Sequence, residues 1–325
     1  MDMNEVIRAE GLHKRYGTTH ALAGVDLSVG RGTVLGVLGP NGAGKTTAVR
    51  TLATLIKPDS GRAEICGFDV VHDAVRVRAK IGLTGQYASL DEELTGTENL
   101  VMIGRLLDFP RAEAKARARD LLARFRLSDA AGRAVKTYSG GMRRRLDLAA
   151  SLVNRPEVVF LDEPTTGLDP RARNEVWETV RTIVSEGASV LLTTQYLEEA
   201  DALADRIVVF DQGRVIAEGT ADELKAGAGR QTLVVRAAEA HRTEQLTAIV
   251  TRLTGERPDV SDSGLVSVPV PDATVLSALV RALDEAVITV TELALRMPSL
   301  DEVFLNLTGH TAETADEKIM EGSPA

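Results

Sequence analysis

The stretch Gly39-Pro40-Asn41-Gly42-Ala43-Gly44-Lys45-Thr46-Thr47 decides the fold of this chain. The part from Gly39 to Thr46 matches the pattern G-x-x-x-x-G-K-[ST] in full. A short apolar run at residues 33–38 precedes it, as expected for a buried parallel strand, and a helical pattern follows to about residue 56. Strand, glycine-rich loop and helix in this order are the context that the motif requires, so the stretch predicts a phosphate-binding loop.

The residue types of the loop indicate its chemistry. Glycines allow backbone N–H groups to point inward around a phosphate, and the N-terminus of the following helix adds partial positive charge. Lys45 is expected to reach the β- and γ-phosphates of a nucleotide, and the Thr46 hydroxyl is expected to bind Mg²⁺. The competing interpretation is a glycine-rich turn beside a surface lysine. The predicted ATP-binding residues of the loop are Gly39, Pro40, Asn41, Gly42, Ala43, Gly44, Lys45, Thr46 and Thr47.

A second apolar run, at residues 158–161, ends in Asp162 and Glu163. A carboxylate at the end of a buried strand can hold Mg²⁺, directly or through water, and this is the role expected of Asp162. Glu163 is expected to be catalytic, because it can orient a water for in-line attack on the γ-phosphate. Two adjacent acids here are unusual as mere surface charge, since ligands of parallel sheets bind at the carboxyl ends of the strands.

The rest of the first two thirds of the chain alternates strands with helices. Apolar runs at residues 189–193 and 206–210 fit buried strands, which predicts right-handed crossovers and a parallel sheet. Together with the phosphate loop, this predicts the α/β fold of a P-loop NTPase. Between residues 86 and 139 the pattern becomes helical. We therefore expect a nucleotide-binding domain over residues 1–228 that contains a helical subdomain at about residues 88–150.

A glycine-rich joint at residues 227–229 predicts a domain boundary. Beyond it, strand and helix spacings alternate, which predicts a small accessory α+β domain at residues 229–309, compatible with a ferredoxin-like arrangement. This region has no phosphate loop and no paired acids. Residues 310–325 are polar and are predicted to be a disordered tail. The last predicted helix carries an apolar face made of Leu300, Val303, Phe304 and Leu307.

Composition excludes several other classes of protein. Of the 325 residues, 44% are hydrophobic and 26% are charged, which excludes a disordered or collagen-like chain. The formal net charge of −9 argues against a nucleic-acid coat, and no nucleic-acid partner is predicted. The single cysteine, Cys66, excludes an internal disulfide. No apolar run approaches the ~20 residues of a membrane-spanning helix, so the chain is not expected to form a channel itself.

A third element lies between the loop and the acids. Ser139-Gly140-Gly141 opens an amphipathic helix and exposes backbone donors at its N-terminus, while Arg143, Arg144 and Arg145 are expected on a solvated face of that helix. With this element in place, residues 5–225 resemble the nucleotide-binding domain of ATP-binding cassette (ABC) proteins.

The resemblance to ABC proteins implies further roles. Tyr16 corresponds to the aromatic that stacks on adenine, and Gln86 to the glutamine that senses Mg²⁺ and contacts the transmembrane partner. Asp169 corresponds to the loop that crosses a dimer interface, and Gln195 to the switch residue that contacts the γ-phosphate. In this family each ATP lies between the phosphate loop of one subunit and Ser139, Gly140 and Gly141 of the other, which implies a homodimer in the ATP-bound state.

Two positions depart from the usual family pattern. The signature reads Tyr138-Ser139-Gly140-Gly141-Met142 where L-S-G-G-Q is usual, although the Ser-Gly-Gly core is intact. Gln195 stands where a histidine is usual; its amide can donate a hydrogen bond to a phosphate oxygen but cannot become cationic.

The departures and the tract 300–310 resemble one subgroup, the actinobacterial drug-export ATPases of the daunorubicin/doxorubicin-resistance type. Membership implies an ATPase that requires Mg²⁺ and powers efflux of a hydrophobic, anthracycline-like drug. It also implies a separate integral membrane permease as partner and a peripheral location on the cytoplasmic side of the membrane.

Two other functions are compatible with the same motifs. One is a soluble ABC ATPase that acts on ribosomes or DNA, although the ribosomal class carries two cassettes per chain and the DNA-repair class carries long coiled coils. The other is a regulatory nucleotide-binding module with little hydrolysis, which Gln195 permits and Glu163 argues against.

Overall fold

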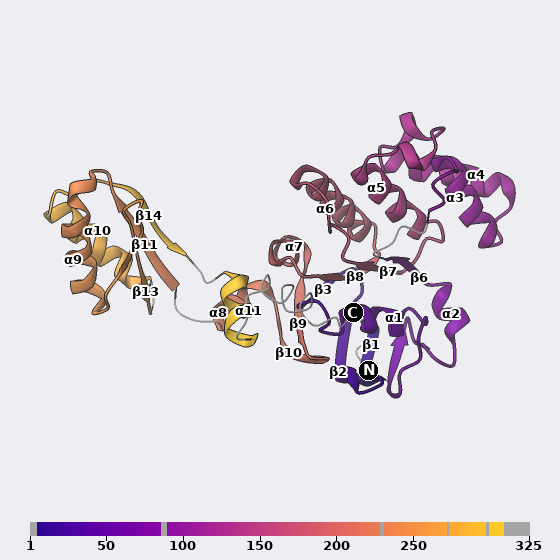
Figure 1. Ribbon diagram of the computed structural model, residues 1–325, viewed down its shortest axis with the longest axis horizontal. Helices are drawn as coiled ribbons and strands as arrows, with labels where there is room; N and C mark the ends of the chain where they lie inside the picture. Colours follow the sequence, from indigo (N-terminus) through magenta and orange to yellow (C-terminus); the bar gives the residue numbers. More distant parts are fainter. Residues whose placement is uncertain (1–4, 86–89, 228–230, 272, 297–298, 309–325) are drawn as a thin grey trace, which may run out of the picture. The chain divides into compact units, whose positions relative to one another are not determined.

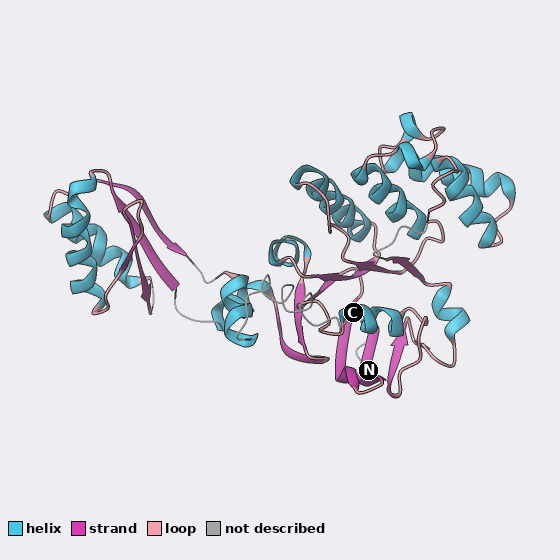
Figure 2. Cartoon of the chain, viewed as in Figure 1, coloured by secondary structure: helices cyan, strands magenta, loops and turns pink. Residues whose placement is uncertain are grey.

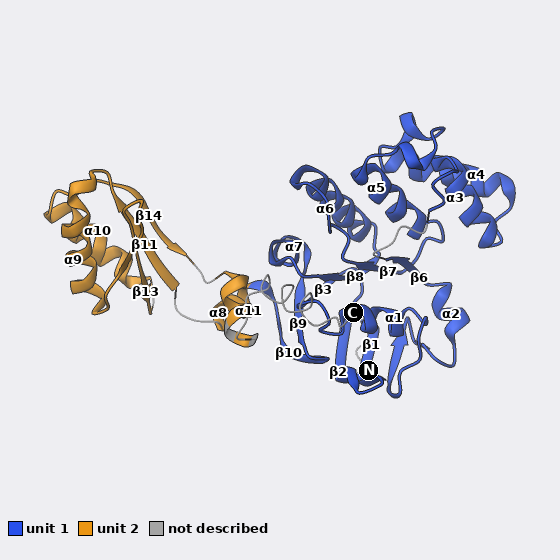
Figure 3. Cartoon of the chain, in the orientation of Figure 1, with its two compact units in different colours: residues 1–221, 311–325 blue, residues 222–310 orange. Residues whose placement is uncertain are grey.

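The structure is a computed structural model that describes residues 5–85, 90–227, 231–271, 273–296 and 299–308. The chain divides into two compact units, of which the first ends at Ala221 and the second comprises residues 222–310 (Figures 1 and 3). Helix α8 (Ala221–Gly227) thus falls almost wholly in the second unit. The limits at 228 and 229 stay a prediction, and the predicted tail at 310–325 lies outside the described residues.

A six-stranded sheet of order β10-β9-β3-β8-β7-β6 forms the centre of the first unit. Every neighbouring pair is parallel except the antiparallel pair of β9 and β10, so the predicted parallel α/β sheet is confirmed. The strands are β3 (Val34–Leu38), β6 (Ile81–Thr84), β7 (Val158–Asp162), β8 (Ser189–Thr194), β9 (Arg206–Asp211) and β10 (Arg214–Gly219).

Both faces of this sheet are covered (Figure 2). Along β7, Val159 and Leu161 belong to one hydrophobic cluster, while Val158 and Phe160 belong to another on the opposite face. All four side chains are fully buried. A strand that is apolar at every position is what a sheet packed on both sides requires. The helices that flank the sheet are α1 (Lys45–Leu52), α2 (Ala74–Arg78), α6 (Pro170–Ser185) and α7 (Leu197–Leu203).

An antiparallel sheet of order β2-β1-β4-β5 packs in the same cluster as Phe160 and helix α1. Its strands are β1 (Glu5–Tyr16), β2 (Thr19–Gly30), β4 (Ser60–Ile65) and β5 (Phe68–Asp69). Alternate residues of β1, including Ile7 and Ala9, are buried against this cluster. The sheet supports the first turn of α1 and therefore the phosphate loop.

The expected helical insertion is present. It contains α3 (Gly96–Leu106), α4 (Arg111–Arg124), α5 (Gly140–Ser151) and the short 3₁₀ turns η1 (Ser128–Ala130) and η2 (Val135–Thr137). Helix α3 begins with a capping box, in which Thr95 accepts from the Glu98 backbone and Glu98 accepts from the Thr95 backbone. Leu100, Leu121 and Leu146 of the three helices join one buried cluster, which fixes the start of α5 relative to the main sheet.

The second unit has a four-stranded antiparallel sheet of order β12-β13-β11-β14. With helices after the first and third strands, this is the order of a ferredoxin-like fold, as the sequence suggested. The elements are β11 (Gln231–Ala237), η3 (Ala240–Arg242), α9 (Thr243–Thr254), β12 (Asp259–Val260), β13 (Leu265–Val270), α10 (Thr274–Glu285), β14 (Val290–Arg296) and α11 (Leu300–Thr308).

The predicted apolar face of α11 is only partly correct. Leu300, Val303 and Phe304 are buried, but Leu307 is 44% exposed. Leu307 lies in the last turn of the helix. Within the described residues, no helix is long and apolar enough to cross a membrane.

Candidate nucleotide-binding site

The phosphate loop joins the end of β3 at Leu38 to the start of α1 at Lys45. Gly44 caps the helix with φ of 108°, a left-handed conformation that favours glycine. A Cβ on Gly44 would lie 2.3 Å from the carbonyl oxygen of Ala21, and one on Gly39 would lie 2.5 Å from the carbonyl oxygen of Phe210. The two motif glycines are therefore required by close backbone approaches from β2 and β9.

The Lys45 side chain is only 4% exposed, and its ammonium lies in the mouth of the loop. Its Nζ donates to the carbonyl oxygens of Gly39 at 2.6 Å and Pro40 at 3.1 Å. The Oε1 atom of Glu163 lies 3.6 Å from the same nitrogen. A buried ammonium needs such partners, because an isolated buried charge is very costly.

Asp162 lies at the end of β7, beside the loop. Its Oδ1 accepts hydrogen bonds from the Thr193 hydroxyl on β8 at 2.5 Å and from the Thr46 hydroxyl at 3.3 Å. The structure thus brings together two of the three sequence-predicted metal ligands, Thr46 and Asp162, while the third, Gln86, lies outside the described residues. A hydroxyl and a carboxylate are hard oxygen donors that suit Mg²⁺, which keeps several waters and takes the rest of its shell from phosphates. The donor set fits this ion.

Glu163 has a φ of 50°, which is unusual for a residue with a side chain. Its backbone N–H lies 3.1 Å from both the carbonyl and the hydroxyl oxygen of Thr193. This conformation directs the Glu163 carboxylate toward Lys45 rather than along the strand. The residue expected to orient water is therefore next to the residue expected to hold phosphate.

The Ser139 side chain caps α5 and accepts a hydrogen bond from the Met142 backbone at 3.3 Å. Ser139 and Gly140 are exposed, so the N-terminal backbone donors of this helix face solvent. Tyr138 is instead buried, and its hydroxyl donates to the Ala130 carbonyl at 2.8 Å. A Cβ on Gly96 would lie 2.4 Å from that hydroxyl. Tyr138 therefore serves the helical core, with Gly96 making room for the larger ring.

Three of the remaining predicted residues, Tyr16, Asp169 and Gln195, are among those that the structure describes. Asp169 caps α6 by accepting from the Ala172 backbone at 2.9 Å and is exposed. Gln195 directly follows β8 and is half-buried. Tyr16 is 51% exposed, which leaves its ring open to a ligand, with the Lys14 ammonium 5.8 Å from its centre. Gln86 lies outside the described residues.

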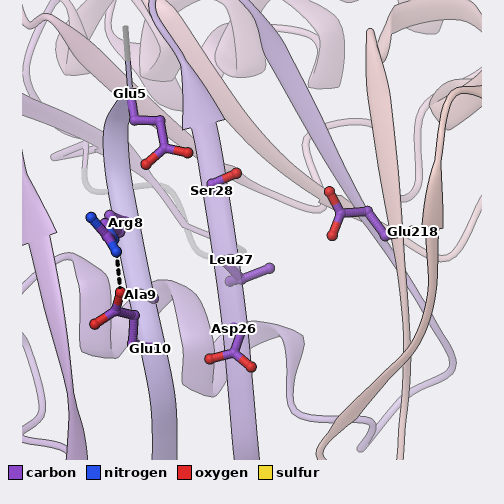
Figure 4. Close-up of a pocket in the computed structure, with 8 residues that line it drawn as sticks. All are labelled: Glu5, Arg8, Ala9, Glu10, Asp26, Leu27, Ser28 and Glu218. Atoms are coloured by element: carbon purple, nitrogen blue, oxygen red, sulfur yellow. Dashed lines mark ion pairs between the residues drawn. The ribbon is translucent and has the colours of Figure 1, made fainter. Parts of the chain in front are cut away.

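Two cavities of the first unit differ in chemistry. One of about 850 Å³ is lined by Asn41, Glu163 and Gly140, so it opens onto the loop, the acids and the α5 N-terminus. Another is lined by Glu5, Glu10, Asp26 and Glu218 (Figure 4), with one cation, Arg8, paired to Glu10. An acidic groove of this kind repels polyphosphate. Only the first cavity suits a nucleotide.

Sequence reasoning missed three buried polar residues near the site. Thr193 lies between the loop and the acids, and nothing in its local sequence marks it. Glu199 on α7 is fully buried and accepts from the Trp177 indole at 3.1 Å, and burial is the main cause that raises the pKa of its carboxyl. Arg144 was expected on a solvated face but has only 12% of its side chain exposed, so that expectation was wrong. The acid Asp147, three residues later on α5, was the available signal.

A phosphate loop and strand-end acids at one edge of a parallel sheet, with a helical insertion that presents a Ser-Gly-Gly helix start, define an ABC-type ATPase. Residues 22–166 match the family model for ABC transporters. Residues 219–308 match the model for the C-terminal domain of DrrA1-3-like ATP-binding proteins.

Individual relatives agree with the family models. The daunorubicin resistance ATP-binding protein DrrA3 of Streptomyces coeruleorubidus is 60% identical over 93% of this chain and 96% of its own. The daunorubicin/doxorubicin resistance ATP-binding protein DrrA of Streptomyces peucetius is 52% identical over 94% and 93%. Among solved structures, an ATP-binding subunit of an ABC transporter is 29% identical with a TM-score of 0.62, covering 68% of this chain and 92% of that one. The chain belongs to the DrrA-type ATP-binding proteins of the ABC transporter family and is an ATPase subunit.

The steric role of Gly44 yields a prediction for nucleotide binding. In Gly44→Ala, the clash with Ala21 and the left-handed backbone would together cost about 1–3 kcal/mol and displace the N–H groups of the loop. We expect ATP affinity, measured by titration with a fluorescent nucleotide, to fall by roughly 10- to 100-fold. The control is Gly187→Ala, which has a similar φ of 98° and open space around it. Equal affinities for both variants would contradict the steric account.

Proposed function

We propose that this chain hydrolyses ATP at the edge of its parallel sheet to drive export of a hydrophobic, anthracycline-like drug through a separate membrane permease. The observation that carries the catalytic part is the buried cluster of Lys45, Asp162 and Glu163, which joins a phosphate-binding cation to two acids. The relatives' names support the export part, because both are drug-resistance ATP-binding proteins.

Lys45 and the backbone donors of the loop bind the phosphates in this proposal. The Lys45 ammonium exchanges its bonds to Gly39 and Pro40 for bonds to β- and γ-phosphate oxygens. The loop residues 39–47 bind the α- and β-phosphates through N–H groups and the α1 N-terminus. Tyr16, exposed at the end of β1, stacks on the adenine.

Thr46 and Asp162 would hold Mg²⁺, with Gln86 completing the set. Mg²⁺ neutralises charge on the β- and γ-phosphates when it is bound. The Thr193 hydroxyl donates a hydrogen bond to the Asp162 carboxylate and holds it in place.

Glu163 acts as the group that orients water for attack on the γ-phosphorus and accepts its proton. Its carboxylate lies next to the Lys45 ammonium, and therefore next to the phosphate that Lys45 would bind. Gln195, at the end of the adjacent strand β8, donates a hydrogen bond to a γ-phosphate oxygen. Positioning of these groups supplies the catalysis, since phosphoryl transfer needs little covalent chemistry from the protein.

The complete site forms between two copies of the chain. Ser139, Gly140 and Gly141 present exposed helix N-terminal donors, which are suited to the γ-phosphate of an ATP held by the other copy. Asp169 lies at the exposed start of α6 and contacts the partner near this interface. The dimer works on the cytoplasmic face of the membrane, bound to its permease as a peripheral subunit.

The role of Glu163 is tested by Glu163→Gln, which keeps the shape of the side chain but removes the proton acceptor. We expect ATP affinity to be retained, turnover to fall by about 10²- to 10⁴-fold, and an ATP-trapped dimer to accumulate in size-exclusion chromatography. The control is Glu198→Gln, because Glu198 is a highly exposed acid on α7. Ordinary turnover in Glu163→Gln would show that another group activates the water.

Drug export is tested in a bacterial host that is sensitive to daunorubicin. The chain is co-expressed with a candidate permease from the same genome, and intracellular daunorubicin fluorescence is followed over time. We expect efflux only when the permease and the wild-type chain are both present, and none with Glu163→Gln. Efflux that is equal with Glu163→Gln, or resistance conferred by the chain without a permease, would contradict the proposal.

A further inference from the structure

We propose that Arg144 is the positioning residue of the catalytic acid: it ties the end of β7, and with it the Glu163 carboxylate, to the helix that carries Ser139. The inference rests on the proposed role of Glu163 and adds a residue outside the family motifs described above. It concerns how turnover depends on the helical subdomain, not how ATP is bound.

The guanidinium of Arg144 contacts two separate segments of the main chain. Its Nε donates to the Pro164 carbonyl at 2.6 Å, Nη2 donates to the Glu163 carbonyl at 3.2 Å, and Nη1 donates to the Gly85 carbonyl at 2.9 Å. Nη1 also lies 3.4 Å from the Asp147 carboxylate. The planar guanidinium has five N–H donors spread over three nitrogens, so it can satisfy these acceptors together. The ammonium of a lysine has all its donors on a single nitrogen and cannot do so.

The Arg144–Asp147 pair is buried, with 12% and 2% of the two side chains exposed. Burial lowers the pKa of Arg144, and the negative charges of Asp147, Glu199 and Asp162 act against this effect. A buried ion pair is weak evidence for stability, because desolvation of both ions offsets their attraction. The carbonyl contacts therefore point to a role in placing the main chain.

The backbone that Arg144 holds includes Glu163, which has a positive φ. A positive φ on a residue with a side chain is strained and persists only where its surroundings enforce it. Thr193 holds the Glu163 amide from one side, and Arg144 holds the Glu163 and Pro164 carbonyls from the other. Together these bonds keep the Glu163 carboxylate beside Lys45.

The same helix carries both contacts. Arg144 and Ser139 lie within the first turns of α5 and its cap, so a displacement of the signature also displaces the donor to the Glu163 carbonyl. Misplacement of a reacting group by about 1 Å can cost roughly 10²-fold in rate. Turnover should therefore depend on Arg144, while ATP binding at the loop should not.

The chain supplies a matched control in Arg117 on α4. Its side chain is also 12% exposed, it pairs with an acid three residues later, Asp120, and it donates to the Leu152 carbonyl at 2.7 Å and to the Val153 carbonyl at 3.4 Å. Those carbonyls follow the far end of α5 and do not contact Glu163. Arg117 thus shares the side-chain burial and main-chain bonding of Arg144, with an acid that is 67% exposed in place of the buried Asp147, and it has no connection to Glu163.

The test uses the full chain and measures kcat, KM for MgATP and thermal stability. Arg144→Met alone would remove the cation opposite the buried Asp147 carboxylate, so it is paired with Asp147→Asn in a double variant that removes both charges and keeps the shape of the acid side chain. We expect kcat to fall by about 10- to 100-fold with KM changed by less than about threefold. Arg144→Lys keeps a positive charge opposite Asp147. We expect its thermal stability to be close to that of the wild type and its kcat to stay low. Arg117→Met should leave kcat unchanged.

A cycle with Glu163→Gln separates the two proposals. In this cycle, the two substitutions at positions 144 and 147 are added to Glu163→Gln. If Arg144 acts through Glu163, they do not lower the residual rate of Glu163→Gln any further. A further loss by the same factor, or a kcat restored by Arg144→Lys, or a double variant with ordinary turnover would overturn the positioning role while leaving Glu163 in place. Ordinary turnover of Glu163→Gln itself would instead refute the proposed function of that residue.

Discussion

The in-register parallel pairing of β3, β8 and β7 is the constraint on which the site depends. Leu38 pairs with Thr194, and Asp162 pairs with Thr193, so the three strands end level with one another. The loop after β3 and the acids of β7 therefore lie at one edge of the sheet, with the Thr193 hydroxyl between them. A shift of β8 by one residue would turn Thr193 to the opposite face and leave Asp162 without its shortest hydrogen bond.

Electrostatic balance follows from that arrangement. The buried ammonium of Lys45 faces the Glu163 carboxylate, and the neighbouring Asp162 carboxylate accepts from the Thr46 hydroxyl at the same edge of the sheet. Carbonyl groups of the loop occupy the remaining hydrogen-bonding capacity of the lysine. Contacts within the chain thus hold the loop cation and the oxygen atoms of Thr46 and Asp162 in position.

Local patterns made much of this predictable from the sequence. The loop, the acid pair and the Ser-Gly-Gly helix start are each contiguous in the sequence, and their residue types indicate their chemistry. The apolar runs predicted the parallel sheet. Contacts between distant segments were not predictable. The Ala21 carbonyl that excludes a side chain at Gly44 comes from β2. The main-chain carbonyls that accept from Arg144 lie 18 to 59 residues away in the sequence. Periodicity also placed Leu307 on the apolar face of its helix, whereas its side chain is 44% exposed. A pattern of apolar residues does not show which of them another segment covers.

The central claim is that a complete site needs the loop of one copy and the signature of another. Lys45→Ala removes the loop cation, and Gly140→Asp places a negative charge at the signature, where an acid in the first turn still favours the helix. Neither variant alone should hydrolyse ATP in a single-turnover assay. In an equal mixture of the two variants, half of the dimers contain one copy of each. Each of these dimers has one site with an intact loop and an intact signature and one site with neither. The amplitude of ATP hydrolysis is therefore expected to be about a quarter of that of the wild type. A mixture no more active than either variant alone would contradict the account.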